Sequence, residues 1–259
     1  MHRPYMNDVE NWKPSKYVMR RGRLTPTTVR AELAPSSRFI AHLVASRYQK
    51  AIAEHANGKL LDLGCGKVPL YEAYRDRVSE NVCADWPSTI HKSSYIDTFC
   101  DLSKALPFGD SAFDTILSSD VIEHLPDHDL AFREMGRVLA PGGTLLLNTP
   151  FMYMVHEIPH DFYRHTRFSI ERLTALAGLQ VVELDEIGGG LDVLVDILAK
   201  YASGIPVIGN FFAIGLQKAA ALMSGTVVWE RQRKASASRF PLGYFLVARK
   251  PDATNMARQ

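Results

Sequence analysis

Short apolar runs alternate with helix-like segments along most of this chain, and that alternation limits the fold more than any other feature. Strand-like runs lead into Gly64 and end at Asp85, near Asp101 and at Ser119. Parallel strands need long crossover connections, which helices usually supply. The alternation therefore predicts a mainly parallel α/β sheet with helices on both faces. Ligands of such sheets bind beyond the carboxyl ends of the strands.

The pattern of the whole chain predicts further helices and strands and a division into five segments. Helices are expected from Ser36 or Ser37 to Asn57-Gly58, over 129–140, and from Ser169 to Gly178. Further strands are expected over 144–151, 179–187 and 243–250. The expected organisation is an N-terminal arm or lid (1–35), a core (36–187), an apolar helical insertion (188–240), the last strand of the core (241–250) and a tail (251–259).

The insertion interrupts the alternation. Residues 201–217 carry no charge, but glycines, Pro206 and Asn210 break the stretch. A membrane-spanning helix needs about 20 mostly apolar residues, so two or three amphipathic helices are expected instead. Three roles stay open for them: covering the sheet or the active site, lining an apolar acceptor pocket, or peripheral membrane contact through 188–228.

Charge and cysteine content exclude several classes of protein. The net charge is +2, so no nucleic-acid partner is expected. Basic residues near both ends are expected to be solvated; an anionic substrate or membrane surface is the alternative. The three cysteines fit no zinc pattern, and no secretory apolar segment is present at the start. A cytoplasmic location is therefore expected, with membrane-peripheral association as the alternative, and the oligomeric state stays open.

The motif "LLDLGCGKVPLY" predicts a ligand-binding turn. Gly64 and Gly66 allow a tight turn and a close approach of the backbone to a ligand. Asp85, at the end of the next strand, can accept hydrogen bonds from ribose hydroxyls. A nicotinamide site prefers a third glycine where this chain has Pro69. Asp62 would repel a pyrophosphate, whereas it suits an ammonium or sulfonium group.

Together with "CDLSKALPFGDSAFDTILSSDVIEHLPD" and "EMGRVLAPGGTLLLNTPF", this motif resembles the successive motifs of class I S-adenosylmethionine-dependent methyltransferases. The small-molecule group called methyltransferase type 11 is the most similar, and the resemblance covers about residues 58–187. It implies a seven-stranded sheet whose last strand is antiparallel and forms a hairpin with the sixth. Val68 departs from the pattern, since many members have a third glycine there.

The resemblance implies S-adenosylmethionine as cofactor and S-adenosylhomocysteine as product. Asp85 would hold the ribose, with Trp86 beside the adenine, and Ser119 and Asp120 would flank the methionine end. The full set of implied cofactor contacts is Asp62, Gly64, Cys65, Gly66, Asp85, Trp86, Asp101, Leu102, Ser119 and Asp120.

The segment "HEIPHDFYRHT" begins with the H-E-x-x-H spacing of zinc proteases. Pro159 disfavours the helix that such a site needs, and no third ligand follows, so no metal is expected. The segment is instead expected to bind a polar acceptor through His156, Glu157, Asp161, Tyr163 and Arg164. An internally bonded loop, with Asp161 paired to Arg164 or Arg167, is the alternative.

Two histidines are candidates for the chemistry. His124, just past the fourth strand, and His160 could take a proton from the acceptor. A structural role stays open for His124, because methyl transfer depends mainly on alignment.

The expected function is methyl transfer to oxygen or nitrogen of a small or lipid-linked acceptor, with a sugar or glycolipid preferred over a quinone-like compound. A non-catalytic, regulatory or scaffolding protein that binds the cofactor is the first alternative. A nicotinamide-dependent oxidoreductase is the second, disfavoured by Asp62 and Pro69.

Overall fold

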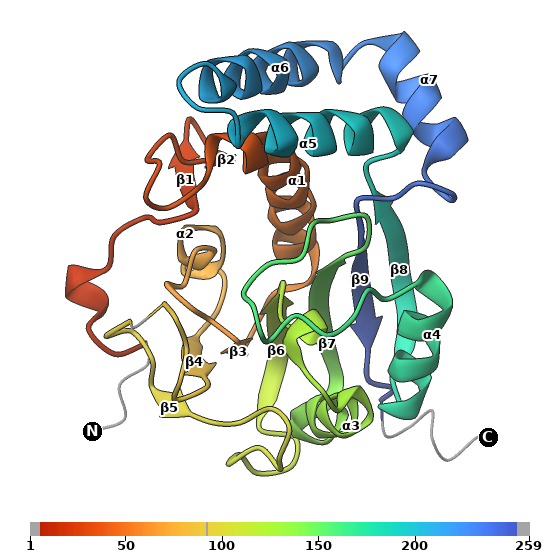
Figure 1. The fold of residues 1–259 in the computed structure, drawn as a ribbon. Helices are drawn as coiled ribbons and strands as arrows, with labels where there is room; N and C mark the ends of the chain where they lie inside the picture. The colour runs from red at the N-terminus through yellow and green to blue at the C-terminus, as the bar shows by residue number, and fades with distance from the viewer. Residues whose placement is uncertain (1–5, 92, 253–259) are drawn as a thin grey trace.

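A seven-stranded sheet forms the centre of the protein in the computed structural model, which describes residues 6–91 and 93–252 (Figure 1). Its strands are β3 (Lys59–Leu63), β4 (Glu80–Asp85), β5 (Thr98–Phe99), β6 (Phe113–Ser119), β7 (Leu139–Pro150), β8 (Gln180–Ile187) and β9 (Gly243–Arg249). They lie in the order β5-β4-β3-β6-β7-β9-β8. β9 is antiparallel to both β7 and β8, and the other pairs are parallel. The expected sheet, including its antiparallel last strand, is confirmed.

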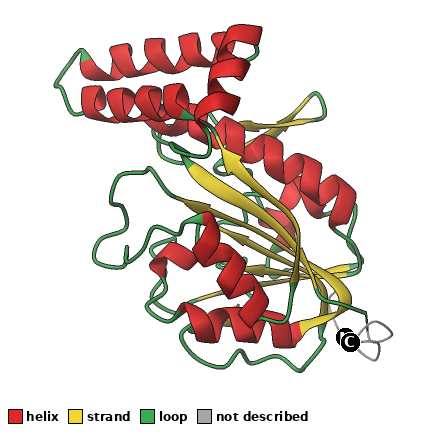
Figure 2. Cartoon of the chain, turned by 90° about the vertical axis from the view of Figure 1, so that its right-hand side faces the viewer, coloured by secondary structure: helices red, strands yellow, loops and turns green. Residues whose placement is uncertain are grey.

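Helices cover both faces of the sheet (Figure 2). Side chains alternate between the faces of a strand, so the neighbours Leu60 and Leu61 belong to two different apolar cores. Leu60 packs in the core that contains α1 (Arg38–His55) and α2 (Tyr71–Tyr74). Leu61 packs in the core that contains α3 (His128–Val138) and α4 (Arg167–Leu176).

Three local predictions were wrong in their boundaries. β7 begins at Leu139 because Phe113 of β6 pairs with that residue, so the strand includes residues expected to end the preceding helix. α4 begins at Arg167, two residues before the predicted start. The N-cap is Thr166, whose side chain accepts a hydrogen bond from the backbone amide of Ser169. β5 has only two residues.

The expected N-terminal arm folds onto the core. Within it, β1 (Tyr17–Arg20) and β2 (Arg23–Pro26) form a hairpin, and Tyr17 is 1% exposed. Trp12 donates a hydrogen bond to the carbonyl oxygen of Val68 at 3.3 Å. The hairpin could not be predicted from the sequence, because strands of four residues show too little alternation to be recognised.

The insertion consists of three helices: α5 (Gly190–Ser203), α6 (Gly209–Met223) and α7 (Val227–Ser236). They lie beyond one end of the sheet (Figures 1 and 2). α7 is tied to α5 through buried Asp192, which accepts hydrogen bonds from Trp229 and Arg233. Among the described helices none alone has the length and apolar character to cross a bilayer; α6 and α7 reach them only as a pair bent by 97°.

Candidate functional site

A cavity of about 660 Å³ lies at the carboxyl ends of β3, β4 and β6. This volume is within the usual range for small-molecule sites, about 300–1,000 Å³. Nine of the ten expected cofactor contacts line it: Gly64, Cys65, Gly66, Asp85, Trp86, Asp101, Leu102, Ser119 and Asp120. Separate strand ends bring these residues together, as the topology requires.

The turn after β3 depends on glycine. Gly64 has φ +75°, and its amide donates a hydrogen bond to the carbonyl oxygen of Ala84 at 2.8 Å. A Cβ atom at Gly64 would lie 2.4 Å from Cγ2 of Val121. Gly66 has φ +50°. The turn therefore brings bare backbone to the cavity wall, where a ligand can approach it closely.

Asp85 connects this turn to β4. Its Oδ2 accepts a hydrogen bond from the Gly66 amide at 2.9 Å, and its Oδ1 accepts one from the Trp86 amide at 2.8 Å. Burial raises the pKa of Asp85, although these bonds oppose the rise. Each carboxylate oxygen can accept a further hydrogen bond, for example from a ribose hydroxyl. Trp86 and Leu102 supply apolar wall beside it, so the residues present fit a nucleoside such as that of S-adenosylmethionine.

Asp62 is the expected contact that lies elsewhere. It does not line the cavity; it is 3% exposed and accepts a hydrogen bond from the Tyr74 hydroxyl at 3.2 Å. Burial raises the pKa of Asp62 to about 7. The expectation of direct contact with the methionine part of the cofactor is therefore corrected, because a shielded and partly protonated carboxyl neither touches nor strongly attracts an ammonium group.

A second cavity of about 230 Å³ adjoins the first. Lys16, Glu32, Asp120 and Glu157 line both. The walls of the smaller cavity are mixed. Its polar side includes Asn148, Thr149, Tyr153 and His156, and its apolar side includes Leu33, Ile40, Val44, Ile187 and Leu242. This mixture fits an acceptor that has both a polar and an apolar part.

An ion pair marks the boundary of the two cavities. Lys16 Nζ lies 2.9 Å from Asp120 Oδ2, and Asn148 Nδ2 donates to Asp120 Oδ1 at 2.5 Å. Burial alone would lower the pKa of Lys16, but Asp120 raises it above its usual value. Burial would raise the pKa of Asp120, but Lys16 lowers it below its usual value. Lys16 lies in the expected arm, and nothing in the sequence pointed to it.

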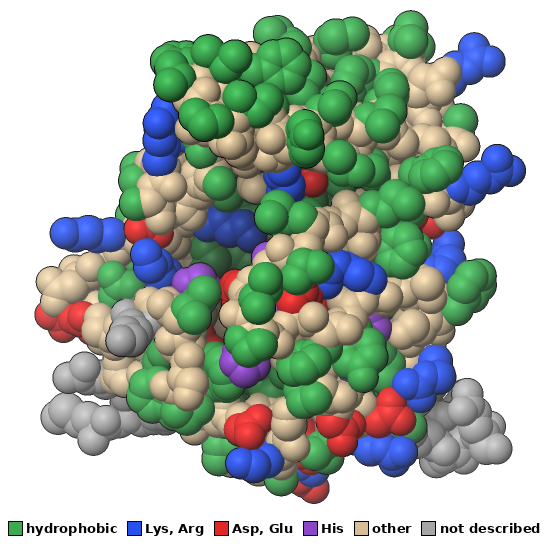
Figure 3. Space-filling view, in the orientation of Figure 1, with side chains coloured by type: hydrophobic (Ala, Val, Ile, Leu, Met, Phe, Trp, Pro, Cys, Tyr) green, Lys and Arg blue, Asp and Glu red, His purple; other side chains and the backbone are tan. Residues whose placement is uncertain are grey.

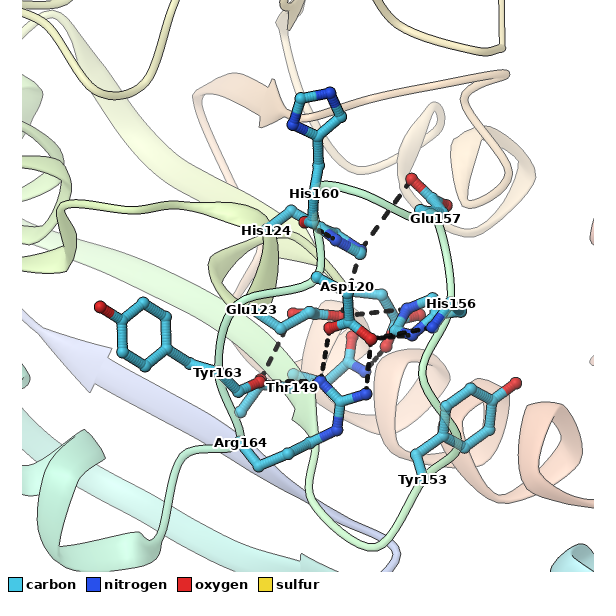
Figure 4. Close-up of polar contacts among 12 residues, drawn as sticks. Asp120, Glu123, His124, Thr149, Tyr153, His156, Glu157, His160, Tyr163 and Arg164 are labelled. Atoms are coloured by element: carbon cyan, nitrogen blue, oxygen red, sulfur yellow. Dashed lines mark hydrogen bonds and ion pairs between the residues drawn. The ribbon is translucent and has the colours of Figure 1, made fainter.

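The segment expected to bind the acceptor is a loop between β7 and α4, and Figure 4 shows its polar contacts. His156 lines the smaller cavity, and Glu157 lines both. His124, on the loop after β6, lines the larger cavity and contacts the carbonyl oxygen of His160 through Nδ1 at 2.7 Å. A carbonyl oxygen only accepts, so Nδ1 of His124 carries the proton and Nε2 holds a lone pair.

Three expected acceptor contacts line neither cavity. Arg164 donates to both carboxylate oxygens of Asp161, at 2.6 and 2.7 Å, and to the carbonyl oxygen of Met154. This pairing lowers the pKa of Asp161. The ring of Tyr163 packs against that of His128, with centroids 4.3 Å apart. The expectation is corrected for these three residues. Asp161 and Arg164 stabilise the loop by bonding to each other, as in the alternative interpretation. The ring of Tyr163 packs at the start of α3 instead of lining a cavity.

The H-E-x-x-H spacing does not form a protease-type zinc site. Residues 156–160 are not helical, as expected from Pro159. The side chain of His160 points away from Glu123 and His156 (Figure 4). Its ring lies against Trp86, with centroids 4.9 Å apart. His160 thus lies on the side of the cavity expected to hold the adenine, which disfavours the catalytic role expected for it.

Comparison with known proteins gives one family match. Residues 61–147 match the model of a methyltransferase domain. This range runs from β3 to β7 and includes the glycine turn, Asp85 and the loop after β6.

Two curated relatives cover part of the chain. A methyltransferase, GfsG, from Streptomyces halstedii is 35% identical over 104 residues, 36% of this chain and 37% of the relative. The ubiquinone/menaquinone biosynthesis C-methyltransferase UbiE from Shewanella frigidimarina is 31% identical over 130 residues, 50% of this chain and 43% of the relative. The chain thus spans about two fifths of the length of these relatives.

Solved structures share the fold over most of the chain. A putative sarcosine dimethylglycine methyltransferase from Galdieria sulphuraria superposes with a TM-score of 0.53 at 18% identity, covering 82% of this chain and 88% of the other. The [4+2]-cyclase SpnF gives a TM-score of 0.52 at 20% identity, covering 93% and 87%. At these identities the likeness establishes the fold alone.

Proposed function

Because this chain carries a class I, S-adenosylmethionine-dependent methyltransferase domain, we propose that it transfers a methyl group from that cofactor to oxygen or nitrogen of a small or lipid-linked acceptor. The observation that carries the proposal is the pair of adjoining cavities. The larger has the residues for a nucleoside, and the smaller opens beside Asp120, where the methionine end of the cofactor is expected.

The larger cavity would hold the cofactor in one orientation. Asp85 would accept hydrogen bonds from the ribose hydroxyls, and Trp86 and Leu102 would flank the adenine. Ser119 and Asp120 would lie at the other end, where the two cavities meet. When bound, S-adenosylmethionine supplies an electrophilic methyl group on a sulfonium.

The smaller cavity would hold the acceptor. Its polar side includes Asp120 and Glu157, and its apolar side includes residues of α1 together with Ile187 and Leu242. Alignment within about 3–3.5 Å supplies most of the acceleration that such a transfer needs. His124, with its Nε2 lone pair, lies on the larger-cavity side of this junction, and His156 lies on the other side.

A hydroxyl-bearing acceptor such as a sugar or glycolipid suits the polar side of the smaller cavity, and its apolar side suits a lipid portion. The UbiE relatives are named C-methyltransferases of quinone biosynthesis, which makes a quinone-like acceptor, methylated at carbon, the second candidate. Acceptor extracts separated into polar-lipid and quinone fractions distinguish the two by the product that carries the labelled methyl group.

Cofactor binding is the first test. We expect S-adenosylmethionine to bind the purified chain. Asp85→Ala should weaken binding about 100-fold or more, because two hydrogen bonds to a charged carboxylate are lost at about 1.5–3 kcal/mol each. Calorimetric titration of both proteins gives the two dissociation constants.

Titration of NADH into the same proteins is the control. Binding of NADH in place of S-adenosylmethionine would contradict the proposal. S-adenosylhomocysteine formation with cell extract as acceptor separates an enzyme from a protein that only binds the cofactor: cofactor binding without product from any extract would favour the second.

We further propose that the insertion contacts a membrane surface carrying the acceptor. The outer face of α5 is apolar yet exposed at Leu194, Ile197, Leu198 and Tyr201, spaced as one helical stripe. α6 exposes a second set, Phe211, Phe212, Leu222 and Met223. Figure 3 shows hydrophobic side chains gathered over these helices. Residues 188–240 hold six basic and three acidic residues.

Two of the basic residues, Lys200 and Arg233, pair with the buried Asp196 and Asp192. The four that stay exposed are Lys218, Arg231, Lys234 and Arg239. An apolar face with exposed basic residues is typical of helices that lie on anionic membranes.

Vesicle binding tests this contact. The chain is expected to float with vesicles rich in phosphatidylglycerol. Phe211→Ser/Phe212→Ser should weaken this binding at least about 100-fold, since each buried phenylalanine contributes about 1.5–3 kcal/mol. Phe168→Ser is the matched control, because Phe168 is 74% exposed on α4, outside the insertion. Equal loss in both variants, or no flotation of the wild type, would contradict the contact.

A further inference from the structure

Three side chains from two loops converge near the junction of the cavities: Glu123, His124 and His156. Their ligand atoms all lie within 4.8 Å of one another. Nε2 of His124 lies 3.8 Å from Oε1 of Glu123, and Nε2 of His156 lies 3.9 Å from the same oxygen. Figure 4 shows the three side chains directed toward one another.

The contacts of the two histidines leave Nε2 of each ring available to a ligand. Nδ1 of His124 donates to the carbonyl oxygen of His160, so its Nε2 carries a lone pair. Nδ1 of His156 lies 3.2 Å from Oδ2 of Asp161 but has no hydrogen-bond partner among the described residues. A neutral His156 with its proton on Nδ1 presents its Nε2 lone pair, as metal-binding histidines usually do.

Glu123 supplies the third lone pair. Its side chain is fully buried, and its Oε1 has no hydrogen-bond partner among the described residues. Its Oε2 accepts only a long hydrogen bond from Thr149, at 3.3 Å. Oε1 of Glu123 thus faces the two imidazole nitrogens without a hydrogen-bond partner, and a buried polar atom without a partner costs about 1–3 kcal/mol. A cation bound to all three side chains would remove that cost.

We propose that Glu123, His124 and His156 bind one divalent cation of the Zn²⁺ class. Two imidazoles and one carboxylate form the ligand set of several catalytic zinc and non-haem iron sites. Glu157 lies close enough to join them, since its Oε2 is 4.0 Å from Nε2 of His124. Tetrahedral ligands lie about 3.3 Å apart for bonds of about 2.0 Å, so small side-chain movements bring these atoms into range.

A second group of potential ligands shows the contrast. Glu54, His55 and Glu183 also lie within reach of one another. There Lys50 already provides a cation, with Nζ 3.7 Å from Glu54 and 3.4 Å from Glu183. Lys50 offsets the charge of those carboxylates. Glu123 is acted on by Arg164 only at longer range, because Arg164 is held by Asp161. A bound cation would therefore balance more charge in the first group than in the second.

The use of the cation rests on the proposed function and names its substrate class, a hydroxyl-bearing acceptor. A hydroxyl bound to the cation loses its proton to water more readily, because the positive charge stabilises the alkoxide. The alkoxide oxygen then forms a bond to the methyl carbon while the bond from that carbon to sulfur breaks, its electron pair staying on sulfur. Metal binding itself does not depend on this reaction.

Cobalt titration tests the site on the full chain, freed of metal by a chelator and without cofactor or acceptor. We expect one Co²⁺ per chain with visible absorption bands of low-coordinate cobalt. His156→Ala and the isosteric Glu123→Gln should weaken binding about 100-fold or more, because each removes a direct ligand. His55→Ala, the matched control in the second group, should keep full binding.

Absence of stoichiometric Co²⁺ binding by the wild type would overturn the proposal, as would binding that survives Glu123→Gln or is lost in His55→Ala. Near-ultraviolet circular dichroism verifies that each variant is folded. If a variant does not fold, His124→Asn is measured in its place. S-adenosylmethionine titration on the same metal-free protein separates the two proposals: cofactor binding without metal binding removes only the metal site.

Discussion

Replacing Gly64 with alanine should lower the free energy of unfolding by about 3 kcal/mol and weaken cofactor binding at least about tenfold. Two separate costs add. The φ of +75° costs a residue with a Cβ about 1–2 kcal/mol. The new Cβ would also lie 2.4 Å from Cγ2 of Val121, and such overpacking costs about 1–3 kcal/mol. Denaturant unfolding and calorimetric titration with S-adenosylmethionine measure the two effects.

Gly22→Ala is a matched control for the backbone cost. Gly22 has the same φ of +75°, but a Cβ there would meet nothing within 4 Å. It should therefore lose only about 1–2 kcal/mol and keep cofactor affinity. Val121→Ala in the Gly64→Ala background should recover part of the loss by removing the clash. Equal destabilisation by Gly22→Ala and Gly64→Ala would show that the contact with Val121 is unimportant.

The sheet, and the gathering of the expected cofactor residues around one cavity, could be predicted because their signals are local. A short apolar run shows each strand, and Asp85 and Ser119 stand where such runs end. The topology of a parallel sheet then brings these ends to one edge, however far apart they are in sequence. No knowledge of side-chain packing was needed to place them at the cavity.

Lys16 could not be predicted for the opposite reason. It pairs with Asp120 across 104 positions of sequence, and only the packing of the β1–β2 hairpin places it there. Its own neighbourhood is polar and contains proline, as in many solvated arms. A contact that depends on tertiary packing leaves no periodic signal in the chain.

For the loop between β7 and α4, the composition indicated a candidate binding segment, but the sequence did not indicate what each polar side chain does. The many polar residues there indicated a binding loop, and His156, Glu157 and His160 do line the two cavities. Asp161 and Arg164 bond to each other, however, while His156 turns toward Glu123 on a different loop. Side-chain direction in an irregular segment follows from such pairings, and H-E-x-x-H spacing alone cannot supply them.

Asp62→Asn should raise the free energy of unfolding at about pH 8 by about 4 kcal/mol and have little effect at about pH 4. Burial raises the pKa of Asp62 from 3.8 to about 7 in the folded chain, so the folded state binds more protons than the unfolded state between these values. Stability contributed by the protonated carboxyl is therefore fully present below pH 3.8, falls as the pH rises toward 7 and is lost above it. Asparagine stays neutral, and its amide oxygen can still accept the hydrogen bond from Tyr74.

Urea unfolding of both proteins across this pH range gives the difference in stability at each pH, which should grow between about pH 4 and pH 7 and then level off. Asp76→Asn is the control, because the Asp76 side chain is 86% exposed and its replacement should leave the wild-type curve unchanged. A difference that is constant with pH would mean that Asp62 ionises as easily in the folded chain as in the unfolded one. The carboxyl would then be charged at neutral pH, and the argument that its charge favours a sulfonium or ammonium ligand over a pyrophosphate would regain its force.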